Sequence, residues 1–363
     1  MVESFHVAGF KLFRDIALPK LGRLNLLVGE NNTGKSCLLE ALSLYAGRSP
    51  AADVLGIAAD RTGVKLSPWD GIYDEGTSLI HPVFELFHRT GSESVKRIRI
   101  EKIGDSRPLR LEQRLYRLVK GDGGLLYYEP ALPGHTTEYG AEIAFEIYRG
   151  GDPLVGLVTS RSVEARGRAL EGERVSNGYA PTVFLPARGF SEEKAALMWD
   201  ALVQGPGQDL VLHWLRMLDP RIEDLAYIGG SSGTRLPLLK MQGQSRIPLR
   251  SMGDGLTRMF HIALAAGSAS SGVLLIDEFE NGLHWSVQEK LWETIARAAA
   301  SSNVQVFCTT HSRDCVQGFT AAAAGSDVDA FIYRFERKGD DVFANELPLL
   351  NIGAAMRQHA EVR

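Results

Sequence analysis

The chain contains 363 residues, of which 44% are hydrophobic and 23% charged, with 40 Lys and Arg against 44 Asp and Glu. This composition is typical of a soluble globular protein, and the formal net charge of −4 excludes a uniformly basic coat for nucleic acid. The length allows two or three structural units, because a single hydrophobic core seldom grows past about 250–300 residues.

The cysteines and the N-terminus bear on the compartment. Cys37, Cys308 and Cys315 form neither a CxxC pair nor a metal-ligand spacing, and free thiols are typical of a reducing compartment. Residues 1–20 lack the apolar core and cleavage site of a secretory signal, and no window approaches the roughly 20 apolar residues of a membrane helix. We therefore expect a cytoplasmic protein without a membrane span.

The N-terminal region predicts a strand, a phosphate-binding loop and a helix in direct succession. Residues 24–28 (LNLLV) form a short apolar run that is typical of a buried strand, and residues 36–45 carry leucines at helical spacing. Between them, GENNTGKS at 29–36 matches the pattern GxxxxGK[ST] in the strand–loop–helix context that the motif requires.

Each part of this loop has a chemical role. The glycines let the backbone curl so that its N–H groups face a β-phosphate, and the helix N-terminus adds partial positive charge. Lys35 supplies a cation for the β- and γ-phosphates, and Ser36 a hydroxyl ligand for Mg²⁺. We therefore expect ATP with Mg²⁺ as cofactor. The expected nucleotide-binding residues are Gly29, Glu30, Asn31, Asn32, Thr33, Gly34, Lys35, Ser36 and Cys37.

The middle of the chain predicts two further units. Residues 48–190 are expected to form a mainly antiparallel β insertion, because alternating segments are separated by Gly-Asp turns after a loop-like start. A short strand at 183–185 is included in this insertion. Residues 191–250 predict a helical segment followed by a hairpin at 225–249, which leads into the next motif.

Residues 251–363 alternate between helices and strands, which predicts a parallel sheet covered on both faces. With residues 1–47 this region is expected to form one ATPase core. The expected elements are a helix near 256–266, a strand at 273–276, a helix at 286–299 and strands at 304–309 and 331–335.

Two of these strands end in polar residues. The apolar run 273–276 is followed by Asp277 and Glu278, at the strand end where open α/β sheets bind ligands. We expect Asp277 to bind Mg²⁺ and Glu278 to activate the attacking water as a general base. His311 follows the next strand and is expected to contact the γ-phosphate. Lys35, Glu278 and His311 are thus the catalytic candidates.

The segment RSMGDG at 250–255 precedes a helix and offers a second anion site, formed by the Ser251 hydroxyl and the helix N-terminus. A helix-capping turn is the alternative explanation. Because Lys35 and His311 already account for the γ-phosphate within one chain, we expect Ser251 and Gly253 to meet the ATP of another subunit.

These motifs together resemble the ABC-type ATPases outside the transporters, the SMC, RecF and overcoming-lysogenisation-defect (OLD) group, often classed as AAA-family ATPases. The resemblance implies an α/β P-loop NTPase of the ABC-ATPase type, with a mixed or parallel sheet core, an antiparallel β subdomain and a helical insertion. It also implies that Glu278 is the hydrolytic base, His311 the switch histidine, Ser251 and Gly253 the signature residues, and 281–284 the loop coupling two sites. The matching strings are VAGFKLF at 7–13, GENNTGKS at 29–36, RSMGDG at 250–255, VLLIDEFENGLH at 273–284 and CTTHS at 308–312.

The sequence also departs from parts of that group. RSMGD stands where transporter ATPases usually have LSGGQ, and Phe279 where they have proline, which disfavours a transporter. The interval from Ser36 to Asp277 has no heptad run for coiled-coil arms, and the part after His311 is too short for a Toprim nuclease domain. We therefore expect the ATPase half of a two-part system. Gln113 is the candidate for the family's glutamine loop.

Residues 88–120 contain ten Lys and Arg residues, so charge is segregated along the chain. Arginines there alternate with isoleucines, which places the cations on one face of a strand. Such a face could follow the phosphates of DNA, or it could be the solvated outer face of an antiparallel sheet. Arg188 could likewise contact phosphate or form a structural ion pair. The candidate DNA contacts are Arg97, Arg99, Arg110 and Arg114.

The sequence thus predicts an ATP-hydrolysing module that dimerises, or forms a higher oligomer, around ATP and regulates or powers a partner effector. The expected effector is a nuclease in a prokaryotic phage-defence system. One alternative is a RecF- or SMC-like repair ATPase that itself binds DNA. Another is a nucleotide sensor with little turnover.

Overall fold

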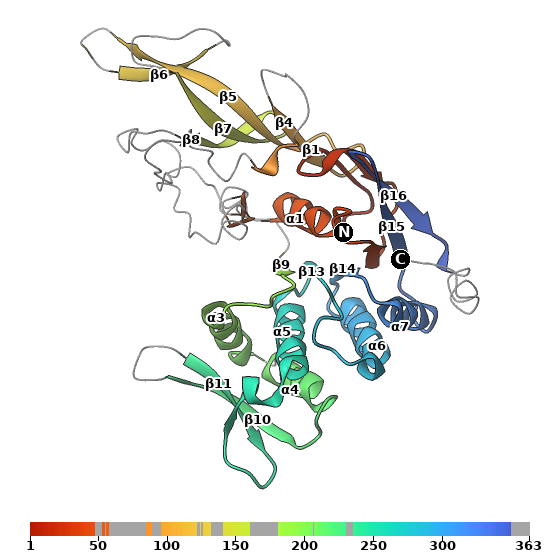
Figure 1. Cartoon of the computed structure of the whole chain (residues 1–363). Helices are drawn as coiled ribbons and strands as arrows, with labels where there is room; N and C mark the ends of the chain where they lie inside the picture. Colours follow the sequence, from red (N-terminus) through yellow and green to blue (C-terminus); the bar gives the residue numbers. More distant parts are fainter. Residues whose placement is uncertain are drawn as a thin grey trace.

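The described part of the chain forms helices and three β-sheets, and Figure 1 shows an antiparallel β part and a helical part on opposite sides of a central sheet. The structure is a computed structural model. It describes residues 1–47, 53–54, 56–57, 85–88, 96–121, 124, 126–131, 141–159, 181–205, 207–229 and 235–349.

The central sheet has six strands in the order β16-β15-β3-β14-β13-β9. Five of them are parallel, and β16 pairs antiparallel with β15 at one edge. Three strands, β3, β13 and β14, are buried at every residue because both faces of the sheet are covered there. Their bounds are β3 Leu24–Gly29, β9 Thr182–Leu185, β13 Val273–Ile276, β14 Gln305–Thr310, β15 Ala330–Lys338 and β16 Asp341–Leu347.

Alternate residues of β13 contribute to two separate cores. Leu274 and Ile276 belong to the core shared with the large helices, whereas Val273 and Leu275 belong to the core on the opposite face. The helices on the first face are α3 Glu192–Val203, α4 Gly207–Arg216, α5 Asp254–Ser268, α6 Trp285–Ser301 and α7 Arg313–Ala324. The opposite face packs on α1, Lys35–Ala46, and on the antiparallel sheet.

The antiparallel sheet has seven strands in the order β2-β1-β4-β5-β7-β8, with β6 paired to β5. Ile98 and Ile100 of β4 are fully buried in the core that also contains α1, so the alternating arginines lie on the outer face. The strands are β1 Phe5–Phe10, β2 Phe13–Leu18, β4 Arg97–Glu101, β5 Leu109–Lys120, β6 Leu126–Pro130, β7 Ala141–Arg149 and β8 Asp152–Thr159.

Three strands fall outside the units expected for them. β9, assigned by sequence to the antiparallel insertion, pairs parallel with β13 in the central sheet, with Leu185 opposite Ile276. β1 and β2, assigned to the ATPase core, instead extend the antiparallel sheet through β4. The sequences of these short strands do not indicate which sheet each strand joins, because that depends on pairing with strands distant in the chain. The wider division at residues 47, 190 and 250 stays a prediction.

The segment before the signature motif contains α3, α4 and a small third sheet. Its strands are β10 Ile222–Gly229, β11 Arg235–Met241 and β12 Ile247–Pro248, and the 3₁₀ turn η2, Leu249–Met252, then leads into α5. The expected hairpin is thus present as β10 and β11. Of residues 48–80, expected from the sequence to be loop-like, the structure describes 53–54 and 56–57, which are helical.

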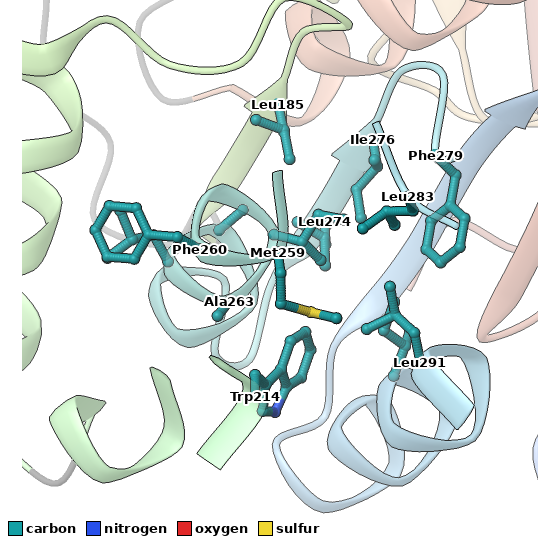
Figure 2. Close-up of a cluster of buried hydrophobic side chains, with 14 of the residues drawn as sticks. Leu185, Trp214, Met259, Phe260, Ala263, Leu274, Ile276, Phe279, Leu283 and Leu291 are labelled. Carbon is teal, nitrogen blue, oxygen red and sulfur yellow. The ribbon is translucent and has the colours of Figure 1, made fainter. Parts of the chain in front are cut away.

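A dense apolar core fixes α5 against the end of β13. Figure 2 shows Met259 of α5 among Leu274 of β13, Trp214 of α4 and Leu291 of α6, and all four are buried. Truncating one such side chain to alanine destabilises a protein by about 2–5 kcal/mol. This packing sets the position of α5 relative to Asp277 and Glu278. Among the helices of the described residues, none is both long and apolar enough to cross a membrane.

Candidate functional site

The phosphate loop leaves β3 at Gly29 and enters α1 at Lys35. Gly29 and Gly34 have φ values of 142° and 95°, which side-chain-bearing residues rarely adopt. A Cβ atom on Gly34 would lie 2.6 Å from Cε1 of Phe13, a fully buried ring. No side chain caps the N-terminus of α1, so its first N–H groups are available for an anion.

Gly34→Ala should therefore disrupt both the loop and its function. The left-handed backbone alone costs about 1–2 kcal/mol in an alanine, and the contact with Phe13 adds a steric term. We expect a clear fall in melting temperature together with weaker ATP binding. Gly104→Ala is the matched control, because Gly104 has a similar φ of 81° but nothing within 4 Å of the added Cβ. Equal effects of the two substitutions would show that the contact with Phe13 is unimportant.

Lys35 is buried, with 5% of its surface exposed. Its Nζ donates hydrogen bonds to the carbonyl oxygens of Gly29 at 2.8 Å and Glu30 at 2.7 Å. Burial lowers the pKa of Lys35 to about 8, while the nearby Asp277 carboxylate opposes this shift. The side chain therefore lies against its own loop, where it can reach phosphates bound by the loop's N–H groups.

Ser36 and Asp277 are brought together from distant parts of the sequence. The Ser36 hydroxyl donates to Oδ1 of Asp277 at 2.9 Å, and the Thr309 hydroxyl donates to the same oxygen at 2.6 Å. A hydroxyl and a carboxylate side by side fit Mg²⁺, which prefers one or two carboxylates together with substrate phosphates. Among the residues that the structure describes, no group of three or more His, Cys, Asp or Glu is placed to hold a metal ion.

Glu278 has a left-handed backbone with φ of 47°. For a residue other than glycine this conformation costs on the order of 1–3 kcal/mol and tends to occur at functional sites. The Glu278 N–H donates to the Thr309 hydroxyl at 2.8 Å, so Thr309 connects Glu278 with Asp277. Thr309, near the end of β14, therefore belongs to the site, although the sequence pattern gave it no role of its own.

Glu278 and His311 line a cavity of about 670 Å³ together with the phosphate loop, and both also line a second hollow beside it. Lys35 Nζ lies 3.5 Å from Nδ1 of His311. Burial and the Lys35 charge both lower the pKa of His311, so the imidazole is neutral near pH 7. The loop residues that line one or both cavities are Gly29, Glu30, Asn31, Asn32, Thr33, Gly34, Lys35, Ser36 and Cys37.

Glu280 is a further site residue that the motifs did not indicate. Its carboxylate accepts a hydrogen bond from the Thr310 hydroxyl at 2.7 Å and another from the His311 N–H at 2.7 Å. It thereby fixes the backbone that carries the histidine. The only sequence signal was a third carboxylate close behind Asp277 and Glu278.

Ser251 and Gly253 lie elsewhere, at the start of α5. Gly253 has φ of 94° and ψ of 167°, a region almost restricted to glycine, and no side chain caps this helix. Ser251 is exposed, and neither residue is among those lining the phosphate-loop cavity of the same chain. Their role toward a partner's ATP stays a prediction.

The arginines of the basic stretch are paired with carboxylates on the outer face of the antiparallel sheet. Three of the four candidate arginines lie near Glu112: Arg114 at 2.9 Å, Arg97 at 3.7 Å and Arg110 at 3.9 Å. Glu146 also lies 2.9 Å from Arg114, and Arg99 pairs with Glu101 at 2.8 Å. This network favours the solvated-face alternative, and DNA binding there stays a prediction.

Two other candidates lie apart from the cavity. Gln113 is within β5, paired in register with Phe145, and is not among the residues lining the phosphate-loop cavity. Arg188 is exposed in the loop after β9. Arg89, another member of the basic stretch, lies outside the described residues. The roles suggested for Gln113 and Arg188 stay predictions.

The sequence matches the family described as AAA domain, putative AbiEii toxin, Type IV TA system, over residues 24–314. The chain belongs to this family of AAA domains. It is 22% identical over 342 residues to a Helicobacter pylori protein named ATP/GTP phosphatase, covering 87% of each chain. It is also 30% identical over 93 residues to an uncharacterized Methanocaldococcus jannaschii protein, covering 26% of this chain and 38% of that one.

Solved structures with the same fold include two heads of Smc proteins. The Smc head bound to the C-terminal winged-helix domain of ScpA has a TM-score of 0.53 at 13% identity, covering 96% of this chain and 98% of that one. The Smc head with an extended coiled coil, bound to the C-terminal domain of ScpA from Pyrococcus furiosus, has a TM-score of 0.51 at 10% identity, with 98% of each chain covered. The expected α/β fold of the ABC-ATPase type, in an SMC-like AAA-family ATPase, is thus confirmed.

Proposed function

We propose that the chain binds ATP with Mg²⁺, hydrolyses it, and self-associates head to tail around the bound nucleotide. The observation that carries this proposal is that Lys35, Ser36, Glu278 and His311 line one phosphate-loop cavity, with Asp277 bonded to Ser36. The name of the Helicobacter pylori relative, ATP/GTP phosphatase, supports the same reaction class.

Each residue has a part in the proposed hydrolysis. The loop N–H groups and Lys35 hold the β- and γ-phosphates, and Ser36 with Asp277 would hold Mg²⁺, which neutralises phosphate charge when bound. Glu278 accepts a proton from the attacking water, since this residue lines the same cavity. The neutral His311 donates a hydrogen bond to the γ-phosphate and loses that contact after hydrolysis.

Self-association explains the position of the signature residues. Ser251, Gly253 and the uncapped start of α5 form an anion-binding surface that does not line the chain's own cavity. In a head-to-tail dimer this surface closes over the ATP of the partner. ATP favours the closed state through its γ-phosphate contacts, and hydrolysis removes them, which shifts the population back.

Ser251→Arg tests this arrangement directly. Ser251 is exposed, so arginine there leaves the monomer fold unchanged but places a bulky side chain in the proposed interface. We expect ATP affinity within about twofold of wild type and loss of ATP-dependent dimer and turnover. Ser301→Arg, at the far end of α6, is the control. Full activity of Ser251→Arg would show that residues 250–255 only begin a helix.

The proposed output is control of a separate effector, such as a nuclease in a prokaryotic phage-defence system. The family description refers to a putative toxin of a toxin–antitoxin system, which supports a role in a system of several proteins. Purification together with the product of a neighbouring nuclease gene, and nuclease activity that follows the ATP state, would test this part of the proposal.

A further inference from the structure

A buried arginine on the signature helix contacts the end of the strand that carries Glu278. Arg258 is the fifth residue of α5 and is 5% exposed. Its Nη2 donates to the carbonyl oxygens of Asp277 at 2.5 Å and Glu278 at 2.9 Å. Its Nη1 donates to the Pro186 carbonyl at 2.9 Å and, at 3.4 Å, to that of Ala187.

These carbonyls lie just beyond the carboxyl ends of two adjacent parallel strands. β9 and β13 pair with Leu185 opposite Ile276, so a single guanidinium spans both strand ends. The planar fork of arginine can serve two separated pairs of acceptors, which the single ammonium of lysine cannot do with the same geometry. Asn281 adds a second link, because its side-chain amide donates to the Ala187 carbonyl at 2.9 Å.

The contact with Glu278 matters because this residue has a left-handed backbone. Its N–H is held by the Thr309 hydroxyl and its carbonyl by Arg258, so the peptide groups on both sides of its Cα are fixed. The direction of the Glu278 side chain toward the cavity depends on these two contacts.

The beginning of α5 also rests directly on the loop after Glu278. A Cβ atom on Gly255 would lie 2.8 Å from the carbonyl oxygen of Gly282, so the two backbones touch there. Arg258 and this contact together connect the signature turn at 251–253 with the carboxylate end of β13 in the same chain.

We propose that Arg258 is a positioning residue that holds Glu278 of its own chain in the orientation needed for hydrolysis. This inference rests on the proposed function, because it concerns the orientation of Glu278, the residue proposed as hydrolytic base. Through α5, closure of the signature turn on the partner's ATP is then transmitted to the base in the same chain.

Arg258→Lys separates positioning from binding. We expect kcat to fall about 10- to 100-fold, while ATP affinity stays within about twofold of wild type and ATP still brings two chains together. Arg258→Gln keeps an amide donor and serves as a second variant, and thermal unfolding shows whether either is folded. Unchanged kcat in a folded variant, or ATP affinity lost in step with kcat, would overturn the proposal.

Mixing two inactive variants shows in which chain Arg258 acts. A dimer of Arg258→Lys with Glu278→Gln should stay inactive, because each chain has a defective base of its own. If Arg258 instead served the partner's site, the mixture would regain activity, since one site would then be intact. Such recovery would contradict the proposal.

The pair Ser251→Ala and Glu278→Gln is the positive control. In the head-to-tail arrangement this mixture contains one intact site and should recover activity. If it does not recover, the head-to-tail proposal is wrong, and the kcat of Arg258→Lys alone still decides whether Arg258 positions Glu278.

Discussion

Replacing Lys35 with alanine is expected to weaken ATP binding by about 100-fold or more. A hydrogen bond to a charged group contributes about 1.5–3 kcal/mol, and Lys35 would contact more than one phosphate oxygen. The side chain is buried at the start of α1 and already bonds the Gly29 and Glu30 carbonyls, so its removal also takes a donor from two carbonyls of the loop. Equilibrium titration with a fluorescent ATP analogue measures the change.

The control for Lys35 removes an equal charge elsewhere. Lys290 is exposed on α6, so Lys290→Ala should leave ATP affinity unchanged. Thermal unfolding should show that both variants are folded. Unchanged affinity in a folded Lys35→Ala variant would refute the assignment of residues 29–36 as the phosphate loop.

Glu278→Gln is expected to reduce turnover by about 10²–10⁴-fold while ATP still binds. General-base catalysis contributes rate factors of this order, and glutamine keeps the size of the side chain without its basicity. A steady-state phosphate-release assay measures the loss, and titration with ATP measures binding. Glu293→Gln, on the exposed face of α6, is the matched control.

Two results, one from Glu278→Gln and one from the wild-type protein, would contradict the role of Glu278 as general base. Turnover near that of wild type would show that another group activates the water. Very low turnover in the wild-type protein itself, with ATP firmly bound, would favour the nucleotide sensor that the sequence left as an alternative.

The phosphate loop and the acidic strand end could be predicted from the sequence because each depends on residues that are close together in the chain. The loop around Lys35 needs only a strand, two glycines and a helix in order, and Asp277 and Glu278 directly follow their strand. Parallel packing then brings the strand ends together, which is why the Ser36–Asp277 contact could be anticipated from the separate motifs.

The contacts that support the site could not be predicted from the sequence, because each joins residues that become neighbours only in the folded chain. Nothing in the local sequence of Arg258 distinguishes it from a surface arginine of an amphipathic helix, yet it is buried against strand carbonyls. Similarly, the partner of Glu280 depends on how β14 ends beside β13. The charge counted over residues 88–120 leaves out Glu146, which pairs with Arg114 but lies farther along the chain.

In the proposed head-to-tail dimer, ATP itself brings two copies of the chain together. Light scattering on Glu278→Gln with Mg²⁺, in the presence and absence of ATP, tests it most directly, because the variant cannot leave the closed state by hydrolysis. We expect the mass of one chain without ATP and of two chains with ATP, and Ser251→Arg in the same background should abolish the change. The same mass with and without ATP would contradict the head-to-tail dimer.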